Sequence, residues 1–359
     1  MNSSIVSIGL SNPGSPIPQE EISRFMQKAH QVSPEEARKL DFLYRKSGID
    51  FRYSVLEDFE KKEFKDFTFF PNNAALLPFP GTRARMEVFE NQAPILAAHA
   101  AKNALEQAGV ESSAISHLIL VSCTGMVAPG VELDLIRRLG IPSAVERYAI
   151  HFMGCYAAFT GIRLADQLVK ANPKARVLVV SVELCTLHFQ KEFTEDNLLA
   201  NSLFGDGAAA ALVTKSEQGL QIKNYFSEVL WEGEKDMAWK IGDFGFEMRL
   251  SQYIPSLLNK GIRRLRDLFE EKFNFSQVQH VAIHPGGKQI LLQVQEAFGL
   301  PAEVNRHALE VLRTCGNMSS VSILFVLERM LQDSSIQGEI LALGFGPGLT
   351  LETTHYEKR

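Results

Sequence analysis

The sequence contains an internal duplication, and this feature constrains the fold more than any other. Three segments of the first half match three segments of the second half in the same order: "AISHLILVSCTG" with "QVQHVAIHPGG", "RRLGIPSAVERY" with "EAFGLPAEVNRH", and "VLVVSVE" with "EILALGF". The offset stays near about 160 residues, which indicates that a whole half-domain of βαβ type is repeated. The join falls near the polar stretch 214–222, so we predict two halves, 1–218 and 219–359.

The matched segments also indicate the fold class. Short runs rich in Val, Ile and Leu at 117–123, 176–184, 280–285 and 339–345 alternate with longer segments of helical period. Such runs are typical of strands that are buried on both faces, so the chain is expected to be an α/β protein. A length of 359 residues fits two halves of this kind better than one ordinary domain.

Composition argues against several classes of protein. Hydrophobic residues make up 45% and charged residues 22%, and no apolar run approaches the ~20 residues that cross a bilayer. The N-terminus does not resemble a secretory signal, so we expect a cytoplasmic protein with no membrane span. A net charge of −5 argues against a nucleic-acid partner. The four cysteines have neither zinc-site spacing nor a disulfide pattern, so we expect reduced thiols and no metal.

The repeat places two chemically distinct residues at equivalent positions. Gly154-Cys155 of the first half aligns with Gly316-Asn317 of the second, and a helical pattern follows each pair. If the halves pack about a pseudo-twofold axis, two helix N-termini point into one cavity. His284, in "AIHPGG", follows a predicted strand and is expected to lie nearby.

These three residues suit acyl transfer from a thioester. A cysteine at a helix N-terminus beside an imidazole can have a pKa of roughly 3.5 to 7.5 and act as a nucleophile. A histidine N–H and an asparagine amide both donate to an oxyanion, and one such donor is typically worth about 2.7 to 4 kcal/mol. Together they fit an enolate formed by loss of CO2 from a malonyl thioester.

Each residue also has a structural interpretation when it is taken alone. Cys155 could be a small buried thiol, His284 a core residue with satisfied hydrogen bonds, and Asn317 a helix cap. The combination of all three at strand or helix ends, at related places in two repeats, favours a site.

Several long motifs resemble the chalcone and stilbene synthase family, the type III polyketide synthases. The motifs are "GCYAAFTGIRLADQL", "SLFGDGAAAALV", "VAIHPGG", "GNMSS" and "GFGPGLTLET", and the resemblance runs from about residue 3 to residue 356. It implies the thiolase fold, a duplicated five-layer αβαβα core, in a homodimer. It also implies a catalytic triad of Cys155, His284 and Asn317. Acyl-CoA and malonyl-CoA are then substrates, and no metal or other cofactor is needed.

The same resemblance implies pocket residues. Phe204 matches a phenylalanine that gates the passage from the coenzyme A tunnel to the cavity, and Met248 stands where plant members have a second one. A flexible methionine there is expected to admit longer or more irregular starters. The remaining pocket positions are Cys123, which replaces a plant threonine, Ser319 beside the triad, and Gly346 and Pro347 in "GFGPG". No Lys-Ser/Thr follows "GFGPG", so it is not a phosphate-binding P-loop.

Coenzyme A is expected to bind at the basic segment "ARKLDFLYRKSGI". Its basic residues are Arg38, Lys39, Arg45 and Lys46, of which Lys39 and Lys46 align best with basic residues of the family. Phe42 stands where a third, an arginine, is expected, so this detail departs from the family. A solvated basic helix face is the alternative interpretation.

The predicted function is repeated decarboxylative condensation of an acyl-CoA starter with malonyl-CoA, followed by ring closure. The segment "SVELCTLHF" resembles bacterial members, including those that make alkylresorcinols or alkylpyrones, so a fatty acyl starter is preferred. A single-round 3-oxoacyl synthase of the initiating type shares the triad and the fold. A non-catalytic acyl-binding partner subunit is a third possibility, against which the intact triad argues.

Overall fold

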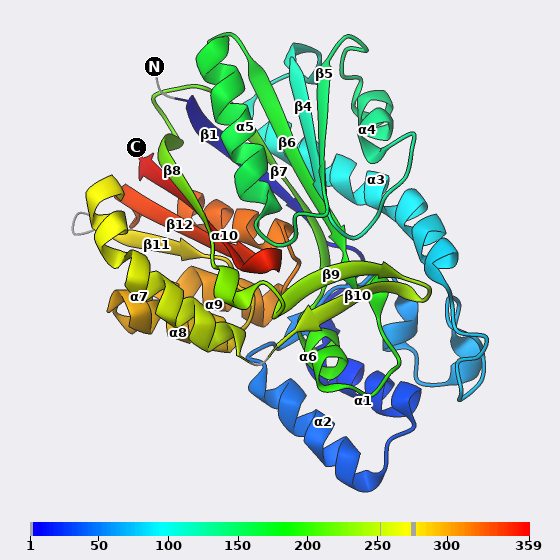
Figure 1. Ribbon diagram of the computed structural model, residues 1–359. Coiled ribbons are helices and arrows are strands. Elements are labelled where there is room, and N and C mark those ends of the chain that lie inside the picture. The colour runs from blue at the N-terminus through cyan, green and yellow to red at the C-terminus, as the bar shows by residue number, and fades with distance from the viewer. Residues whose placement is uncertain (1–2, 252, 274–277) are drawn as a thin grey trace.

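The computed structural model describes residues 3–251, 253–273 and 278–359. Nine strands form one mixed sheet in the order β11-β12-β13-β8-β1-β7-β6-β4-β5. In chain order they are β1 (Ser3–Ser11), β4 (His117–Ser122), β5 (Glu146–His151), β6 (Arg176–Leu184), β7 (Asp206–Lys215), β8 (Leu220–Val229), β11 (His280–Ile283), β12 (Gly338–Gly346) and β13 (Thr350–Lys358). The sheet runs diagonally through the molecule in Figure 1.

Most helices pack on this sheet, and a smaller group lies beyond one end of it. They are α1 (Gln19–His30), α2 (Pro34–Lys46), α3 (Thr82–Ala108), α4 (Val131–Leu139), α5 (Ala157–Ala171), α6 (Glu195–Leu203), α7 (Ile254–Phe273), α8 (Lys288–Phe298), α9 (Arg306–Cys315) and α10 (Val321–Gln332). Of the helices in the described ranges, none is long and apolar enough to cross a lipid bilayer.

The duplication reappears in the sheet topology. In the first half β4 pairs with β6 in parallel, and β6-β7-β1 continue antiparallel; in the second half β11 pairs with β12 in parallel, and β12-β13-β8 continue antiparallel. The two halves meet where β1 pairs with β8 over Ser4↔Gln221 and Ile5↔Leu220. This short contact joins two equivalent sheets into one.

The halves differ at one aligned segment. The first half forms the edge strand β5 there, whereas the second half begins α9. The sequence of α9 explains the difference, because Ala308, Val311, Leu312 and Cys315 are buried at helical spacing. Repetition of sequence therefore does not extend to repetition of every element.

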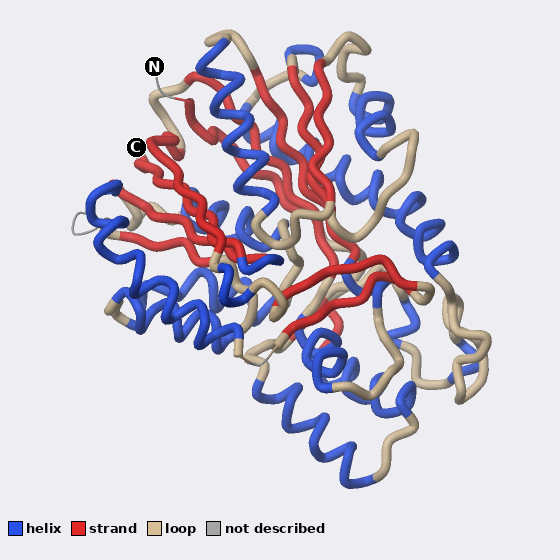
Figure 2. The backbone as a smooth tube through the Cα atoms, in the orientation of Figure 1, coloured by secondary structure: helices blue, strands red, loops and turns tan. Residues whose placement is uncertain are grey.

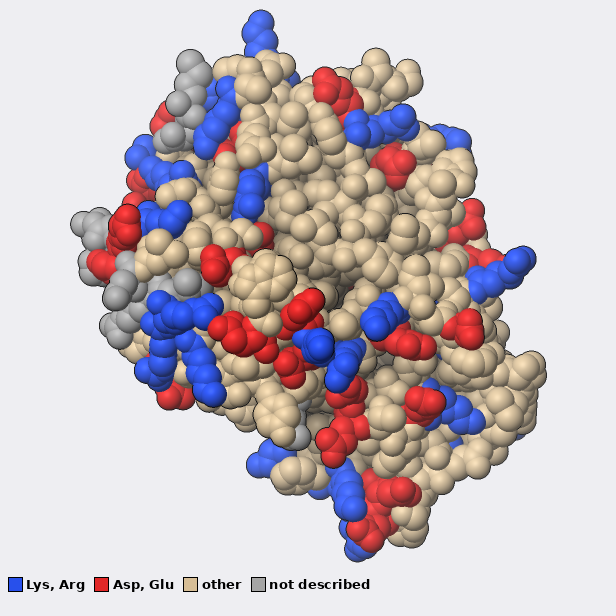
Figure 3. All heavy atoms as spheres, viewed as in Figure 1, with Lys and Arg blue, Asp and Glu red and all other residues tan. Residues whose placement is uncertain are grey.

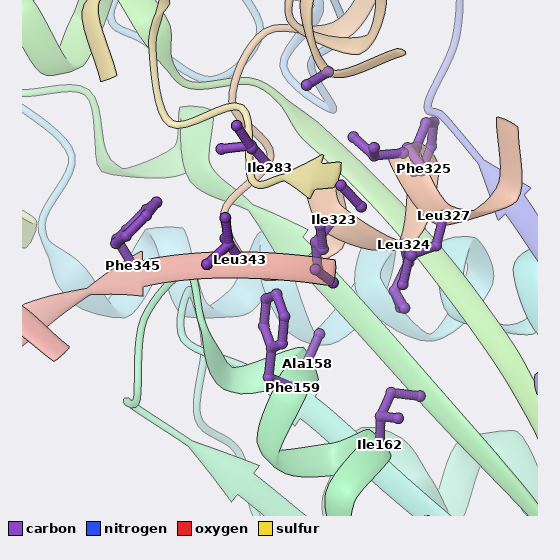
Figure 4. Packing of buried hydrophobic residues seen from close by; sticks show 14 of the residues in the cluster. Ala158, Phe159, Ile162, Ile283, Ile323, Leu324, Phe325, Leu327, Leu343 and Phe345 are labelled. Atoms are coloured by element: carbon purple, nitrogen blue, oxygen red, sulfur yellow. The ribbon is translucent and has the colours of Figure 1, made fainter. Parts of the chain in front are cut away.

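Five layers result from this arrangement. Helices α3 and α4 pack on one face of the first half's strands, α5 and α10 lie between the two halves, and α7 and α8 cover the outer face of the second half. Figure 4 shows Phe159 and Ile162 of α5 in the same packed region as Ile323 and Leu324 of α10, close to β12. The side chains of the buried strand β4 alternate between the two faces of the sheet. Ile119 packs in the central core, and Leu118 packs on the opposite face, in the cluster that includes α3.

A smaller region closes one end of the central layer. It contains α1, α2, α6 and a hairpin of β9 (Met237–Gly242) and β10 (Gly245–Leu250), which crosses in front of α6 in Figure 2. A two-stranded pair of β2 (Ile17–Pro18) and β3 (Phe51–Arg52) ties the chain before α1 to the chain after α2. This region forms one wall of the pocket described next.

Candidate active site

One pocket lies where both halves meet the α1–α6 region. Of the residues predicted for the site, it is lined by Cys123, Cys155, Phe204, Met248, Ser319 and Pro347. These positions are spread over more than half of the chain, and the fold brings them around one space. Three further predicted residues adjoin this lining in other ways: Asn317 accepts a hydrogen bond from the lining residue Ser319, Gly346 precedes the lining residue Pro347, and His284 lies two residues before Gly286, whose carbonyl accepts from Asn317.

Cys155 lies on the strand-to-helix turn that the sequence predicts. Strand β5 ends at His151 and helix α5 begins at Ala157, so the thiol precedes the helix N-terminus. Gly154 has φ +82, and a Cβ built on it would lie 2.3 Å from Pro347 Cδ. A Cβ on Gly346 would lie 3.3 Å from the Cys155 backbone nitrogen. The loop 346–348 therefore packs directly on the turn that carries the nucleophile, which requires glycine at both positions.

Asn317 is held by backbone contacts and presents its amide in a defined orientation. Its N–H donates to the Leu203 carbonyl at 2.9 Å, and its carbonyl accepts from the Gly205 N–H at 2.9 Å. Its Oδ1 accepts from the Ser319 N–H at 2.9 Å, and its Nδ2 donates to the Gly286 carbonyl at 3.2 Å. One amide N–H thus remains for a further acceptor. The Asn317 side chain also acts to lower the pKa of the Cys155 thiol, so the two side chains are neighbours.

His284 lies two residues before Gly286, which Asn317 contacts. Strand β11 ends at Ile283, and the His284 N–H donates to the Leu343 carbonyl at 2.8 Å. The side chain is 2% exposed, and neither ring nitrogen has a hydrogen-bond partner in residues 3–251, 253–273 and 278–359. Burial lowers the pKa of His284 to about 3, so the ring is neutral. An unpaired buried polar group is rare in native structures and indicates a ligand position.

The ionisation of Cys155 differs from the prediction made from sequence. Burial raises the pKa of its thiol to about 12, and hydrogen bonds from Ser319 and Asn317 offset only part of that effect. The imidazole that was expected to help lower the pKa of Cys155 is itself buried and neutral, so it supplies no positive charge. The expectation of a lowered pKa is therefore wrong for the unliganded pocket, where Cys155 is a protonated thiol.

A buried carboxylate that the sequence reasoning did not identify lies behind Cys123. Glu183 is fully buried and accepts hydrogen bonds from the Cys123 thiol at 2.9 Å, the Cys123 N–H at 3.0 Å and the Thr124 hydroxyl at 2.7 Å. The Ser320 hydroxyl donates to it as well. Burial raises the pKa of Glu183, and these donors act against the rise. The sulfur of Cys123 also lies 3.2 Å from Ser319 Oγ, so the network reaches the residue that contacts Cys155.

An aromatic wall of the pocket was also not predicted. Trp239 donates its indole N–H to the Cys123 carbonyl at 2.7 Å, and His188 stacks on Phe246 with ring centroids 4.1 Å apart. His188 is fixed on both sides of its ring, by the Thr124 carbonyl at 2.7 Å and the Phe246 N–H at 2.9 Å. Alternation along the hairpin β9–β10 is the signal that could have found Trp239 and Phe246, since Met248 lies on the same face.

Phe204 lines the pocket at the end of α6. Its carbonyl accepts from Arg52 Nη1 at 2.6 Å, and its backbone bridges to Asn317. Phe204 therefore lies on the same short connection that positions Asn317, and its role as a gate residue stays a prediction.

The four basic residues predicted for coenzyme A are on α2, which is helical as expected and ends at Lys46. Arg38, Lys39, Arg45 and Lys46 are all exposed and none of them lines the pocket. Helix α6 separates them from it, since the Tyr44 hydroxyl of α2 donates to the Asn201 carbonyl at 3.0 Å and Asn201 lines the pocket. At the lower end of Figure 3, where α2 lies, basic side chains are interspersed with acidic ones.

No group of three or more His, Cys, Asp or Glu within the described residues could hold a metal ion.

Comparisons with known proteins agree over the whole chain. Residues 2–217 match the N-terminal domain of the chalcone and stilbene synthases, and residues 221–357 match their C-terminal domain. The Mycobacterium tuberculosis (strain CDC 1551 / Oshkosh) protein "Alpha-pyrone synthesis polyketide synthase-like Pks18" is 31% identical over 333 residues, which cover 89% of this chain and 82% of that protein. "Probable polyketide synthase 1" of Dictyostelium discoideum is 29% identical over 363 residues, which cover 98% of this chain but only 11% of that much longer protein.

Solved structures show the same fold. PKS-I from the brown alga Ectocarpus siliculosus superposes with a TM-score of 0.92 at 28% identity, covering 100% of this chain and 98% of that one. The C-terminal type III polyketide synthase domain of Steely1 from Dictyostelium also gives a TM-score of 0.92 at 28% identity, covering 100% and 99%. These matches confirm the thiolase fold predicted from the sequence. The chain therefore belongs to the chalcone and stilbene synthase family, the acyltransferases known as type III polyketide synthases.

Proposed function

We propose that the enzyme loads a fatty acyl group from its coenzyme A ester onto Cys155, extends it with several malonyl-CoA units, and closes the product to an alkylpyrone or alkylresorcinol-like ring. The observation that carries this proposal is the buried His284 ring with two unpaired nitrogens, linked through Gly286 to an Asn317 amide that is oriented by Ser319. Such groups fit an oxyanion that is present only during the reaction.

Loading begins with removal of the proton from the neutral Cys155 thiol. His284 is neutral and has a free nitrogen, so it can accept this proton when substrate fills the pocket and draws the groups together. The resulting thiolate attacks the acyl thioester carbonyl, the C–S bond to coenzyme A breaks, and the leaving thiolate takes the proton back from His284. The acyl group then remains on Cys155 as a thioester.

Extension uses the same imidazole and amide as donors. The carboxylate of malonyl-CoA leaves as CO2, and the electron pair of the broken C–C bond forms an enolate on the thioester oxygen. The free N–H groups of His284 and Asn317 donate to this oxygen. The enolate carbon attacks the acyl thioester on Cys155, which releases the Cys155 thiolate for the next round.

Two observations support an aliphatic starter and a pyrone-type ring. Flexible methionines, Met26, Met237 and Met248, line the pocket beside its aromatic wall, and such side chains adapt to acyl chains of varied shape. The relative Pks18 carries alpha-pyrone synthesis in its name. We further propose that the enzyme acts as a cytoplasmic homodimer and needs no cofactor beyond its coenzyme A substrates.

A panel of acyl-CoA starters incubated with malonyl-CoA, followed by mass spectrometry of the products, tests the proposal. Products that contain several malonate-derived units and have lost water or CO2 on ring closure support it. A single 3-oxoacyl product would identify a one-round synthase instead. Acyl binding without any Cys155 adduct would identify a non-catalytic partner subunit.

A further inference from the structure

A buried cation in the wall of the pocket takes no part in the steps described above. Arg52 ends strand β3, lines the pocket and is 2% exposed. Of the pocket-lining residues that the structure describes, it is the only lysine or arginine. Its Nε donates to Gln19 Oε1 at 2.8 Å, and its Nη1 donates to the carbonyls of Asn201 at 2.9 Å and Phe204 at 2.6 Å. Burial of a guanidinium costs free energy unless such contacts compensate for it, so these contacts indicate a role.

Arg52 completes the C-terminal end of α6. The last carbonyls of a helix have no partner within the helix, and the helix dipole favours a cation near them. The Asn201 and Phe204 carbonyls accept from Arg52, and the Ser202 carbonyl accepts from Gln19 Nε2 at 2.8 Å. Because Arg52 also binds Gln19, one guanidinium fixes three of these carbonyls, two of them directly and one through Gln19.

The carbonyl between these belongs to Leu203, and it holds Asn317. It accepts from the Asn317 N–H at 2.9 Å, and the Asn317 carbonyl accepts from the Gly205 N–H at 2.9 Å. Arg52 lies against the second strand of this contact as well, because a Cβ built on Gly316, which has φ +69, would be 2.9 Å from Arg52 Cδ. Arg52 therefore contacts both chain segments whose pairing fixes the backbone of Asn317.

We propose that Arg52 is a positioning residue, whose guanidinium holds the end of α6 against Gly316 and Asn317 and so keeps the Asn317 amide directed at the enolate. This inference rests on the proposed function, which assigns that donation to Asn317. Loading of Cys155 depends on the thiol and the imidazole. Displacement of Asn317 is therefore expected to slow malonyl-CoA decarboxylation more than loading, whereas a merely structural role would lower both together.

The first test separates the two half-reactions. Arg52→Lys keeps the charge and most of the stem but lacks the planar fork that reaches two carbonyls. Its rate of CO2 release from malonyl-CoA is expected to fall about tenfold to hundredfold, with Cys155 acylation changed by less than about threefold. In Arg52→Ala, millimolar guanidinium is expected to raise CO2 release at least about fivefold, and methylammonium is not, since only guanidinium has the fork. Equal losses in both half-reactions would overturn the proposal.

A double-mutant cycle tests whether Arg52 acts through Asn317. When Arg52→Lys is added to Asn317→Ala, CO2 release is expected to fall by less than about twofold further, because the group that Arg52 positions is already missing. Losses that multiply in the double variant would show that the two residues act independently, which would overturn the proposal.

Arg85→Lys is the matched control for general destabilisation. Arg85 is fully buried, and its guanidinium donates to the carbonyls of Pro80 at 3.0 Å and Phe189 at 3.2 Å. Urea titration is expected to show a loss of stability similar to that of Arg52→Lys. The ratio of CO2 release to Cys155 acylation is expected to stay within about twofold of the unmodified enzyme. The same selective loss of CO2 release in Arg85→Lys would refute a specific role of Arg52.

Alkylation of Cys155 by iodoacetamide distinguishes failure of the positioning from failure of the proposed function, because it needs no coenzyme A ester. Asn317 acts to lower the pKa of the Cys155 thiol, so its displacement raises that pKa and leaves less thiolate. At about pH 8, Arg52→Lys is expected to slow alkylation about twofold to fivefold, as Asn317→Ala does. This slowing supports the positioning even if malonyl-CoA is not decarboxylated. Unchanged alkylation in Arg52→Lys refutes it even if polyketides form.

Discussion

The backbone N–H of Ser319 donates to Asn317 Oδ1 at 2.9 Å, and together with the bond from Asn317 Nδ2 to the Gly286 carbonyl it fixes the orientation of the Asn317 amide. Ser319 has φ +49, an uncommon backbone conformation for a residue with a side chain. The local strain is consistent with a functional constraint, since the bond leaves the amide nitrogen to act as a donor toward Cys155 and any oxyanion.

Substitution of Asn317 is expected to affect decarboxylation more than loading. Asn317→Ala removes one oxyanion donor, so the rate of CO2 release from malonyl-CoA is expected to fall by about 10² to 10³. Acylation of Cys155, measured by intact-protein mass, is expected to persist. Asn317→Asp keeps the acceptor for Ser319 but places negative charge near the enolate, and it is expected to be at least as impaired. Equal losses in both half-reactions would show that Asn317 is not specific to the enolate.

The reactivity of Cys155 toward iodoacetamide is expected to follow its raised pKa. Burial raises the pKa of the thiol to about 12, so only a small thiolate fraction exists near neutral pH. The alkylation rate of the unliganded enzyme is expected to rise about tenfold per pH unit between about pH 7 and 9. Peptide mapping with Cys155→Ala as the control assigns the adduct. A plateau near pH 7 would instead indicate a resident thiolate.

His284 is expected to make the fold sensitive to acid. Its pKa is lowered from 6.5 to about 3 by burial, so the unfolded chain binds more protons than the native state between these values. The free energy of unfolding therefore falls as pH decreases below about 6.5. Between about pH 7 and 5, the unmodified enzyme is expected to lose about 2 kcal/mol more than His284→Gln. Urea titrations measure this difference, and the exposed His99→Gln is the control.

Gly154 is expected to be essential for placing the nucleophile. Gly154→Ala puts a Cβ 2.3 Å from Pro347 Cδ at φ +82, so the turn that carries Cys155 must move. Loss of acylation is expected, together with destabilisation of at least about 1 kcal/mol. Gly14→Ala is a matched control, because Gly14 has φ +54 but nothing lies within 4 Å of the added Cβ. Normal acylation in Gly154→Ala would contradict the tight packing on Pro347.

The indole of Trp239 is expected to limit the space for the growing chain. Trp239→Ala removes part of the aromatic wall and the hydrogen bond to the Cys123 carbonyl. The product distribution is expected to shift toward longer starters or additional extensions, as read by mass spectrometry. Trp239→Phe keeps most of the aromatic wall and is expected to change the product distribution less than Trp239→Ala does. An unchanged distribution in Trp239→Ala would place the growing chain elsewhere.

Sequence patterns predicted features that depend on local order and on the repeat. They identified the α/β class, the turn at Cys155 between β5 and α5, and the equivalence of Cys155 with Asn317. They could not predict the pKa of Cys155, because its desolvation depends on side chains from many distant segments. Glu183 was missed for the same reason, since within a strand sequence nothing marks a charged residue as buried beneath Cys123.

The different secondary structures of two aligned segments in the repeats also depend on contacts with distant parts of the chain. The alignment of "AVERY" with "EVNRH" did not predict that the first segment forms strand β5 and that the second leads into α9. In the sheet, β5 pairs with β4 at one edge, whereas among the described residues no strand pairs with β11 on the corresponding side. Tertiary context thus decided the secondary structure of two similar segments.

The two helices of the central layer determine which parts of this enzyme can be exchanged. The thiol precedes α5 in one repeat, and the amide precedes α10 in the other. Neither repeat expressed by itself holds a complete set of reacting groups, so swapping or shuffling modules between relatives has to preserve the α5–α10 contact. A shift of α5 relative to α10 would move the thiol away from the amide, so catalysis is expected to be most sensitive to the packing of these two helices.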